Sequence, residues 1–278
     1  MSLITALNKI GLFAILVIAA CDRREPDSGC LLQVLLSSKE HIVQQYYIPT
    51  FFEKNFPSPR LLLKKIGKIS SVVPSEIQSG STNANKVALT FDACSTLLPS
   101  RFDSAVARIL ISTRTPATIF LGGKWVLDRP DDSKFLSSIP FFELGNHSYL
   151  HGHLTNVSDE RLYHELLWTQ EIIYTVTGNI PALFRPPYLE NDARVTRSAA
   201  ELGLLTVCGD LASGDPDQNA TKDKLIDQIR RHVHSGSIII MHINEGGKHT
   251  AEALPDIISL LREKGYTLVT VSQLLKDR

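Results

Sequence analysis

The chain of 278 residues places single ionisable side chains directly after short apolar runs. Asp92 follows the run 87–91, and His242 follows the run 238–241. Apolar runs of about four to eight residues that end in a polar residue are typical of buried parallel strands. Because α/β proteins bind ligands at the carboxyl ends of such strands, we expect a carboxylate and an imidazole at one shared rim. Such a pair can accept and return a proton, although Asp92 taken alone is more simply a turn-capping residue, and a single histidine at a strand end is more often structural than catalytic.

A histidine pair follows a third apolar run. His147 and His151 lie four positions apart, after the run 141–144. Two histidines at this spacing can point the same way on one helical turn, which suits two nitrogen ligands on one metal ion. The spacing alone is weak evidence, because surface helices show such pairs by chance. His153 is interpreted as a solvated neighbour.

Two loops carry further polar groups. Residues 184–188 read Phe-Arg-Pro-Pro-Tyr, in which the prolines fix the backbone and set the direction of the Tyr188 N–H. Arg185 can hold a carboxylate through two hydrogen bonds; the alternative is a rigid loop with a surface arginine. Residues 210–217 read DLASGDPD, and as a turn these three aspartates need no function.

A framework that joins these segments is visible from Lys86 onward. Apolar runs alternate with helical patterns that keep one apolar face and stop near Gly178, Gly236 and Gly265. The apolar runs cover residues 87–91, 117–121, 141–144, 182–184, 204–208, 237–241 and 267–271. Strands that alternate with helices predict an α/β fold of parallel βαβ units. Over roughly 190 residues, a barrel-like parallel sheet is the natural closure.

The order of the motifs resembles a known family. The motifs are TFD at 90–92, HSYLH at 147–151, RPPY at 185–188, an Asp-containing loop at 210–217 and IIIMH at 238–242. Over about residues 86–275, this order resembles the NodB-type polysaccharide deacetylases, carbohydrate esterase family four. The resemblance implies a distorted (β/α)7 barrel as a domain over 84–278. It also implies metal-dependent removal of N-acetyl groups from an N-acetylglucosamine polymer such as peptidoglycan or a chitin-like glycan.

The resemblance further implies a role for individual residues of this chain. They are the general base Asp92, the metal ligands His147 and His151, the base-orienting Arg185, the oxyanion donor Tyr188 through its backbone N–H, the general acid His242, and the acid-tuning carboxylate Asp215 with Asp210 as the fallback. The implied metal is zinc, with cobalt or another divalent ion as alternatives, and the implied partner is an N-acetylated glycan.

These roles agree with the chemistry of amide hydrolysis. An amide carbonyl is a poor electrophile, and a Lewis-acid metal polarises it and lowers the pKa of bound water. The amine leaves only when it is protonated, so an acid must stand opposite the base. A carboxylate beside a histidine raises the imidazole pKa and helps it carry that proton at neutral pH.

The chain departs from the family pattern at two positions. The family's third metal ligand is a second Asp, and here that position is Ala93, whose methyl group cannot coordinate a cation. Either two histidines and water hold the metal, or Cys94 supplies a thiolate, or the protein is a catalytically impaired glycan-binding lipoprotein. Strand alternation argues against Cys94, since its side chain should point away from the Ala93 direction. Pro216 replaces a pocket-lining Trp, which leaves the shape of the acetyl pocket open.

Residues 1–20 resemble an export signal. Lys9 is their only charge, and the apolar run 10–20 is too short to span a bilayer comfortably. The residues Ile-Ala-Ala-Cys that end at Cys21 resemble the bacterial lipobox, in which the cysteine becomes the lipidated first residue; an ordinary signal peptide or a membrane anchor is the alternative. Each interpretation exports the chain to the cell envelope or periplasm. Residues 21–83 are interpreted as a tether and an N-terminal segment of unassigned role.

Composition excludes some classes of partner. The chain carries 29 basic and 29 acidic residues, which argues against nucleic acid or an anionic membrane surface. The four cysteines are too few and too scattered for a disulfide scaffold. Cys94 and Cys208 are expected either to pair in an oxidising compartment or to remain two buried thiols.

Overall fold

The structure is a computed structural model that describes residues 73–277 except Leu97, together with four short strands nearer the N-terminus. These strands form two antiparallel pairs, β1 (Ile15–Val17) with β2 (Gln33–Leu35) and β3 (Ser37–Ser38) with β4 (His41–Ile42). The chain divides into two compact units, Met1–Ser58 and Pro59–Arg278. The predicted lipidation residue Cys21 lies outside the described residues. Among the described helices, none has both the length and the apolar composition needed to cross a membrane.

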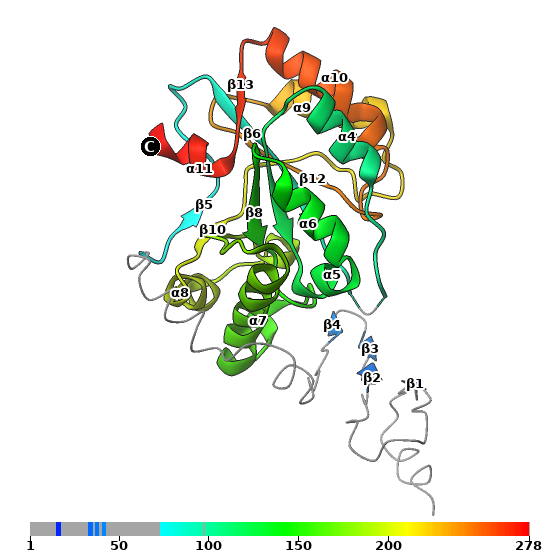
Figure 1. Ribbon diagram of the computed structural model, residues 1–278, viewed down its shortest axis with the longest axis vertical. Coiled ribbons are helices and arrows are strands. Elements are labelled where there is room, and N and C mark those ends of the chain that lie inside the picture. Colours follow the sequence, from blue (N-terminus) through cyan, green and yellow to red (C-terminus); the bar gives the residue numbers. More distant parts are fainter. Residues whose placement is uncertain are drawn as a thin grey trace, which may run out of the picture. The chain divides into compact units, whose positions relative to one another are not determined.

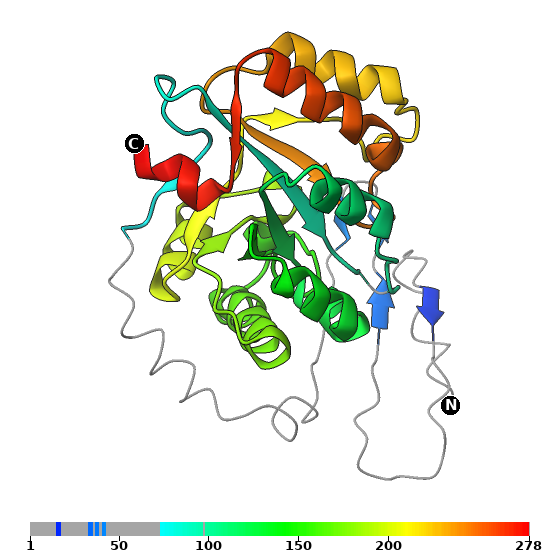
Figure 2. The same ribbon diagram turned by 45° about the horizontal axis from the view of Figure 1, so that its top comes forward.

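A sheet of nine parallel strands forms the centre of the second unit (Figures 1 and 2). In sheet order the strands are β11 (Leu211–Ala212), β12 (Ile238–His242), β6 (Lys86–Ala93), β7 (Ala117–Leu121), β8 (Phe142–Asn146), β9 (Leu183–Phe184), β10 (Leu205–Val207) and β5 (Glu76–Ile77), with β13 (Thr267–Val269) paired to the start of β6. The predicted α/β class and distorted barrel are confirmed. Strand β5 joins this sheet although it precedes residue 84, the expected start of the domain.

Helices surround the sheet (Figure 1). They are α4 (Ser104–Ser112), α5 (Gly123–Asp128), α6 (Pro130–Ser138), α7 (Asp159–Thr177), α8 (Ala193–Glu201), α9 (Lys222–His232), α10 (Thr250–Glu263) and α11 (Val271–Leu274). Helix α10 packs against α9 and α4, while α7 packs against α5, α6 and α8. Helices that pack on parallel strands keep the two apolar faces of those strands away from solvent.

Helix α7 illustrates how local sequence sets the element ends. The Ser158 hydroxyl accepts a hydrogen bond from the Arg161 N–H at the first turn. Gly178 ends the helix with φ of 78°, a left-handed conformation that glycine adopts without steric cost. The helix predicted before Gly178 is therefore present, and the one predicted to run to Gly236 stops earlier, at its cap Val233.

Strand β6 is the structural centre of the site. Its residues Val87, Ala88, Leu89 and Phe91 are completely buried, which explains why the sequence shows a continuous apolar run there. Strand β6 pairs with β12 on one side and with β7 on the other. Asp92 is the register partner of His242 in β12. Two residues 150 positions apart in sequence are thus neighbours at the carboxyl end of the sheet.

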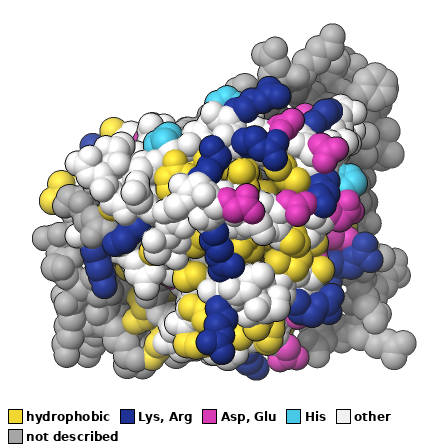
Figure 3. Space-filling model, turned by 90° about the horizontal axis from the view of Figure 1, so that it is seen from above, with side chains coloured by type: hydrophobic (Ala, Val, Ile, Leu, Met, Phe, Trp, Pro, Cys, Tyr) yellow, Lys and Arg dark blue, Asp and Glu magenta, His cyan; other side chains and the backbone are white. Residues whose placement is uncertain are grey.

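The described surface carries charges of both signs. On the face seen in Figure 3, basic and acidic side chains are interspersed, with apolar areas between them. This distribution matches the balanced composition of the chain, with 29 basic and 29 acidic residues.

Candidate active site

A buried ion pair lies at the carboxyl end of β6. Asp92 is 5% exposed, and its Oδ1 accepts a hydrogen bond of 2.8 Å from Nη1 of the fully buried Arg185. Burial acts to raise the pKa of Asp92, but the Arg185 guanidinium and the neighbouring His147 and His242 outweigh it and hold that pKa below its ordinary value. Asp92 is therefore a carboxylate at neutral pH, as a general base requires.

Arg185 is positioned by packing as well as by charge. Its guanidinium carbon lies 4.1 Å from the centroid of the Phe120 ring in β7, a cation–π contact. Gly145 in β8 makes room for that ring, because a Cβ there would lie 2.4 Å from Phe120 Cδ1. The Arg185 backbone N–H donates to the Asn146 carbonyl, which joins the arginine to β8. Strands β7 and β8 thus fix the position of Arg185, the partner of the candidate base.

The two histidines converge beside Asp92. His147 is 1% exposed, and its Nδ1 lies 2.8 Å from the Arg185 carbonyl, so Nδ1–H donates and Nε2 keeps its lone pair. That Nε2 is 3.7 Å from Asp92 Oδ2 and has no hydrogen-bond partner among the described residues. The ring of His151 lies 4.9 Å from that of His147, centroid to centroid.

The backbone that carries these histidines is not the helical turn that the spacing suggested. His147 to His151 form an irregular loop after β8, in which Ser148 and His151 have φ of 58° and 55°. Residues in the left-handed backbone conformation change the direction of the chain, so the two rings meet without a helix. The helical prediction was wrong, while the expected convergence of the rings is present.

Two residues that the sequence did not reveal hold this loop. Both the Tyr149 and the Leu150 N–H donate to one carboxylate oxygen of Glu165 in α7, at 2.8 Å and 2.9 Å. The Asn146 side chain accepts from the Ser148 N–H at 2.9 Å. Glu165 is 3% exposed on a helix face of leucines, and a charge at an apolar position was the only signal for it.

A third metal-ligating atom lies beside the histidines. Cys94 Sγ and one ring nitrogen each of His147 and His151 are all within 4.8 Å of one another. Burial and then the Asp92 charge raise the pKa of Cys94 to about 12, and burial and then His147 lower the pKa of His151 to about 3. A neutral imidazole pair and an unpartnered buried nitrogen are what a divalent cation needs, so the residues present fit the metal implied by the motifs.

The RPPY loop closes the same side of the site. Tyr188 and Leu189 are left-handed, with φ of 57° and 59°, and both side chains are partly exposed. The Tyr188 ring contacts the His151 ring edge-on at 4.6 Å and stacks on the His153 ring at 4.4 Å. His153 also bonds to Glu190 at 2.8 Å. His153 keeps 36% of its side chain exposed, in line with the expected solvated neighbour, but it is also held by Tyr188 and Glu190.

The candidate acid is held on the other side of Asp92. His242 Nδ1 lies 2.9 Å from Asp215 Oδ1, and the His242 N–H donates to Asp215 Oδ2 at 2.7 Å. The Thr250 hydroxyl is a second donor to Oδ2, at 2.7 Å. Burial acts to lower the pKa of His242, but the Asp215 carboxylate outweighs it and raises that pKa above its ordinary value. His242 is thus prepared to carry a proton.

The structure separates the two aspartates considered for this role. Asp210 accepts from the Ile238 N–H at 2.6 Å, at the start of β12, while Asp215 lies at the end of β12 with His242. Gly247 permits the close approach, because a Cβ there would lie 2.8 Å from Asp215 Oδ2. Asp215 therefore lies where its carboxylate can support His242, whereas Asp210 lies at the other end of the strand.

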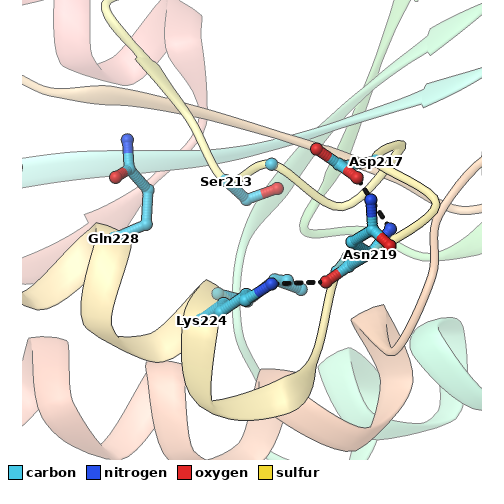
Figure 4. A pocket seen from close by; sticks show the side chains of 8 residues that line it. Ser213, Asp217, Asn219, Lys224 and Gln228 are labelled. Carbon is cyan, nitrogen blue, oxygen red and sulfur yellow. Dashed lines mark hydrogen bonds between the residues drawn. The ribbon is translucent and has the colours of Figure 1, made fainter.

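A small pocket lies between the segment 213–220 and helix α9 (Figure 4). It has a volume of about 200 Å³ and is lined by Ser213, Gly214, Asp217, Asn219, Ala220, Lys224, Leu225 and Gln228. Its lining includes none of the candidate catalytic or metal-ligating residues.

Cys94 and Cys208 are both free thiols, so the second of the two expectations for them, two unpaired thiols, is the one present.

Comparisons with known proteins identify the family. The sequence pattern of the polysaccharide deacetylase family matches residues 79–207. Peptidoglycan-N-acetylmuramic acid deacetylase PdaA of Bacillus subtilis is 30% identical over 202 residues, which are 72% of this chain and 74% of that protein. A bifunctional xylanase/deacetylase of Pseudobutyrivibrio xylanivorans is 28% identical over 79% of this chain, but the chain spans only 35% of that relative's length.

The fold comparison agrees. The crystal structure of a CE4 family pseudoenzyme from Bacillus anthracis matches with a TM-score of 0.67 and 25% identity, over 79% of this chain and 81% of that one. Sequence and fold lead to the same family assignment, and the sequence relatives support the predicted class, hydrolases of linear amides. The chain belongs to the polysaccharide deacetylase family.

Proposed function

We propose that this protein hydrolyses N-acetyl groups of an N-acetylglucosamine-containing cell-wall glycan such as peptidoglycan and releases acetate. One observation carries the proposal: a buried carboxylate and a carboxylate-supported imidazole are register partners at the rim of the sheet, with two further imidazoles beside them. The relative PdaA, a peptidoglycan-N-acetylmuramic acid deacetylase, supports the choice of glycan.

The proposed reaction has two proton transfers, one from the attacking water and one to the departing amine. Asp92, kept ionised by Arg185, takes a proton from the attacking water. The Tyr188 backbone N–H donates to the oxyanion, and a donor of this kind contributes about 3–4 kcal/mol to catalysis. His242, held by Asp215, gives its proton to the departing amine. The carbon–nitrogen bond then breaks, leaving acetate and a free amino sugar.

His147 and His151 are the residues that would hold a divalent cation, with zinc as our choice. Such a cation supplies Lewis-acid polarisation of the amide carbonyl when it is bound. The unpartnered, buried Nε2 of His147 supports this proposal, because buried polar atoms in proteins are nearly always satisfied.

The test is acetate release from chitooligosaccharides and from peptidoglycan, with zinc or cobalt supplied. We expect release by the wild-type protein and loss of it in Asp92→Asn and His242→Ala. Absence of release from every N-acetylated glycan and small amide tested would refute the proposal.

A second candidate function is glycan binding without turnover. Ala93 favours it, since the family's second aspartate is absent, and the solved relative described as a pseudoenzyme shows that this fold also occurs without activity. Glycan binding of equal strength in wild type and His242→Ala, with no acetate formed by either, would establish this function instead.

We also propose that the chain is exported and anchored through a lipid on Cys21. The support is the apolar run 10–20 followed by the lipobox-like residues that end at Cys21. Metabolic labelling with a fatty acid should mark the wild-type protein in the membrane fraction. Cys21→Ser should abolish both the label and the membrane association, and labelling that persists in this variant would contradict the anchor.

A further inference from the structure

We propose that Cys94 is the third protein ligand of the metal site, so that this chain holds its cation by two imidazoles and one thiolate. The inference deepens the proposed function, because it concerns the same site. Its starting point is the convergence of Cys94 Sγ with the His147 and His151 nitrogens, all within 4.8 Å of one another. The family carboxylate that Ala93 cannot provide is thereby replaced by the next residue along the chain.

Cys94 lies directly after β6, whose last residue is Ala93. Side chains alternate along a strand, so Ala93 faces the opposite side from Asp92. Asp92 faces Arg185 and His147, and the Cys94 sulfur lies beside that same His147 and beside His151. The expectation that Cys94 would point away from the metal ligands is therefore wrong, because the strand ends before this residue and alternation no longer sets its direction.

The backbone of Cys94 is held on both sides. The Asn244 side chain donates to the Cys94 carbonyl at 2.7 Å, and its Nδ2 lies 3.9 Å from the sulfur. On the other side, the Gly122 N–H donates to the Ala93 carbonyl at 2.8 Å. A Cβ at Gly122 would lie 3.3 Å from Cys94 Cα, so only glycine permits this close packing without adjustment. Ligands fixed in this way by outer contacts are typical of built metal sites.

A second, independent observation points to a ligand at this place. His147 is 99% buried, its Nδ1–H is bound by the Arg185 carbonyl, and its Nε2 is left without a hydrogen-bond partner among the described residues. An acceptor lone pair in a protein interior is costly unless something occupies it. A cation between this nitrogen, His151 and Cys94 satisfies it.

The donor set selects the metal. A thiolate with two imidazoles suits zinc and disfavours magnesium, calcium and manganese, which prefer oxygen ligands. Three protein ligands also leave one position of a four-coordinate zinc free, as in catalytic zinc sites. The thiol gives up its proton to solvent when the cation binds, because a coordinating thiol is deprotonated.

The experiment uses cobalt(II) and zinc with the full-length chain. Cobalt bound to a thiolate produces a sulfur-to-metal charge-transfer band in the near ultraviolet, which imidazole and carboxylate ligands do not produce. We expect this band in the wild type and its loss in Cys94→Ser. Zinc affinity, measured by competition with a chelator, should fall at least about 10-fold in Cys94→Ser.

Cys208→Ser is the matched control, since Cys208 is the other free thiol of the described residues and lies beside Glu76 instead of the histidines. It should retain both the band and the affinity. A band that survives in Cys94→Ser, or cobalt binding without any such band in the wild type, would overturn the inference. Both readouts are independent of turnover, so inactivity toward glycans would reject the proposed function while leaving the ligand assignment to these measurements.

Discussion

At the scale of single residues, three ionisable groups of the site are each held by a partner from another part of the chain. Asp92 is paired with Arg185, His147 with the Arg185 carbonyl, and His242 with Asp215. These contacts lower the pKa of the candidate base and raise that of the candidate acid, relative to their ordinary values. Opposite shifts are what an acid–base pair working at neutral pH requires.

The pH dependence of turnover follows from His242. Its raised pKa keeps the imidazolium, the form that donates a proton, present to a pH above the ordinary value of 6.5. Asp215→Asn removes the carboxylate that raises this pKa and leaves burial, which lowers it. The alkaline limb of the kcat/KM profile should therefore move to lower pH in Asp215→Asn. Asp210→Asn, a change at the far end of β12, should leave that limb in place; equal profiles for all three proteins would contradict the role of Asp215.

The Asp92–Arg185 pair also bears on stability. Both side chains are at least 93% buried, so Arg185→Met leaves a buried carboxylate without its main counter-charge. We expect the free energy of unfolding to fall by about 3–5 kcal/mol, measured by urea denaturation at pH 7.

The deficit should shrink as the pH is lowered, because protonation of Asp92 removes the uncompensated charge. The double variant Asp92→Asn/Arg185→Met should recover part of the loss. If the double variant is as unstable as Arg185→Met, packing of the arginine on Phe120 rather than its charge is responsible.

At the scale of elements, strands deliver the reacting groups while helices and loops fix them. Strand β8 ends at Asn146, and the irregular loop that follows depends on α7 for its shape. Two residues outside the site also control it. Gly145 leaves room for the Phe120 ring, and the Glu165 carboxylate holds the histidine loop.

Gly145→Ala should disturb the base through its neighbours. The new methyl group would lie 2.4 Å from the Phe120 ring, which carries the Arg185 guanidinium. Overpacking of this kind costs about 1–3 kcal/mol, and we expect a matching loss of stability together with reduced acetate release. Gly152→Ala is the control, since nothing lies within 4 Å of a Cβ at that position. Full activity in Gly145→Ala would show that the ring can move without consequence.

Glu165→Ala should act on the metal site from outside it. The change removes the acceptor of the Tyr149 and Leu150 N–H groups and so releases the loop between His147 and His151. Loss of such outer contacts typically weakens metal affinity about 10- to 100-fold. Zinc competition should show this range for Glu165→Ala and no change for Glu160→Ala, an exposed residue of the same helix. Unaltered affinity in Glu165→Ala would mean that the loop holds its shape alone.

At the scale of the molecule, the sequence predicts the framework better than the finer contacts. Seven strands are recognisable because most of their residues are buried, which leaves a continuous apolar run. Strands β5, β9 and β11 have two residues each, but both residues are buried only in β9, whereas β5 and β11 each have one exposed residue and leave no such pattern. Asp92 and His242 could be found as strand-end groups, whereas Glu165 and Thr250 act through tertiary contacts that no local pattern encodes. The left-handed loop of the histidines was hidden for the same reason, since its conformation depends on α7.

Because the proposed metal ligands come from the ends of β6 and β8, a bound cation should stabilise the whole Pro59–Arg278 unit. At a free zinc concentration 100 times the dissociation constant, binding to the native state alone adds about 2.7 kcal/mol to the free energy of unfolding. For a domain of this size, each kcal/mol corresponds to roughly 2–4 °C, so the Tm should rise by several degrees. Calorimetry should show this rise in the wild type, a smaller one in Cys94→Ser and none in the His147→Ala/His151→Ala variant. A wild-type Tm that is insensitive to zinc would mean that these two segments bind no cation, because stabilisation by a ligand that binds only the native state is a thermodynamic necessity.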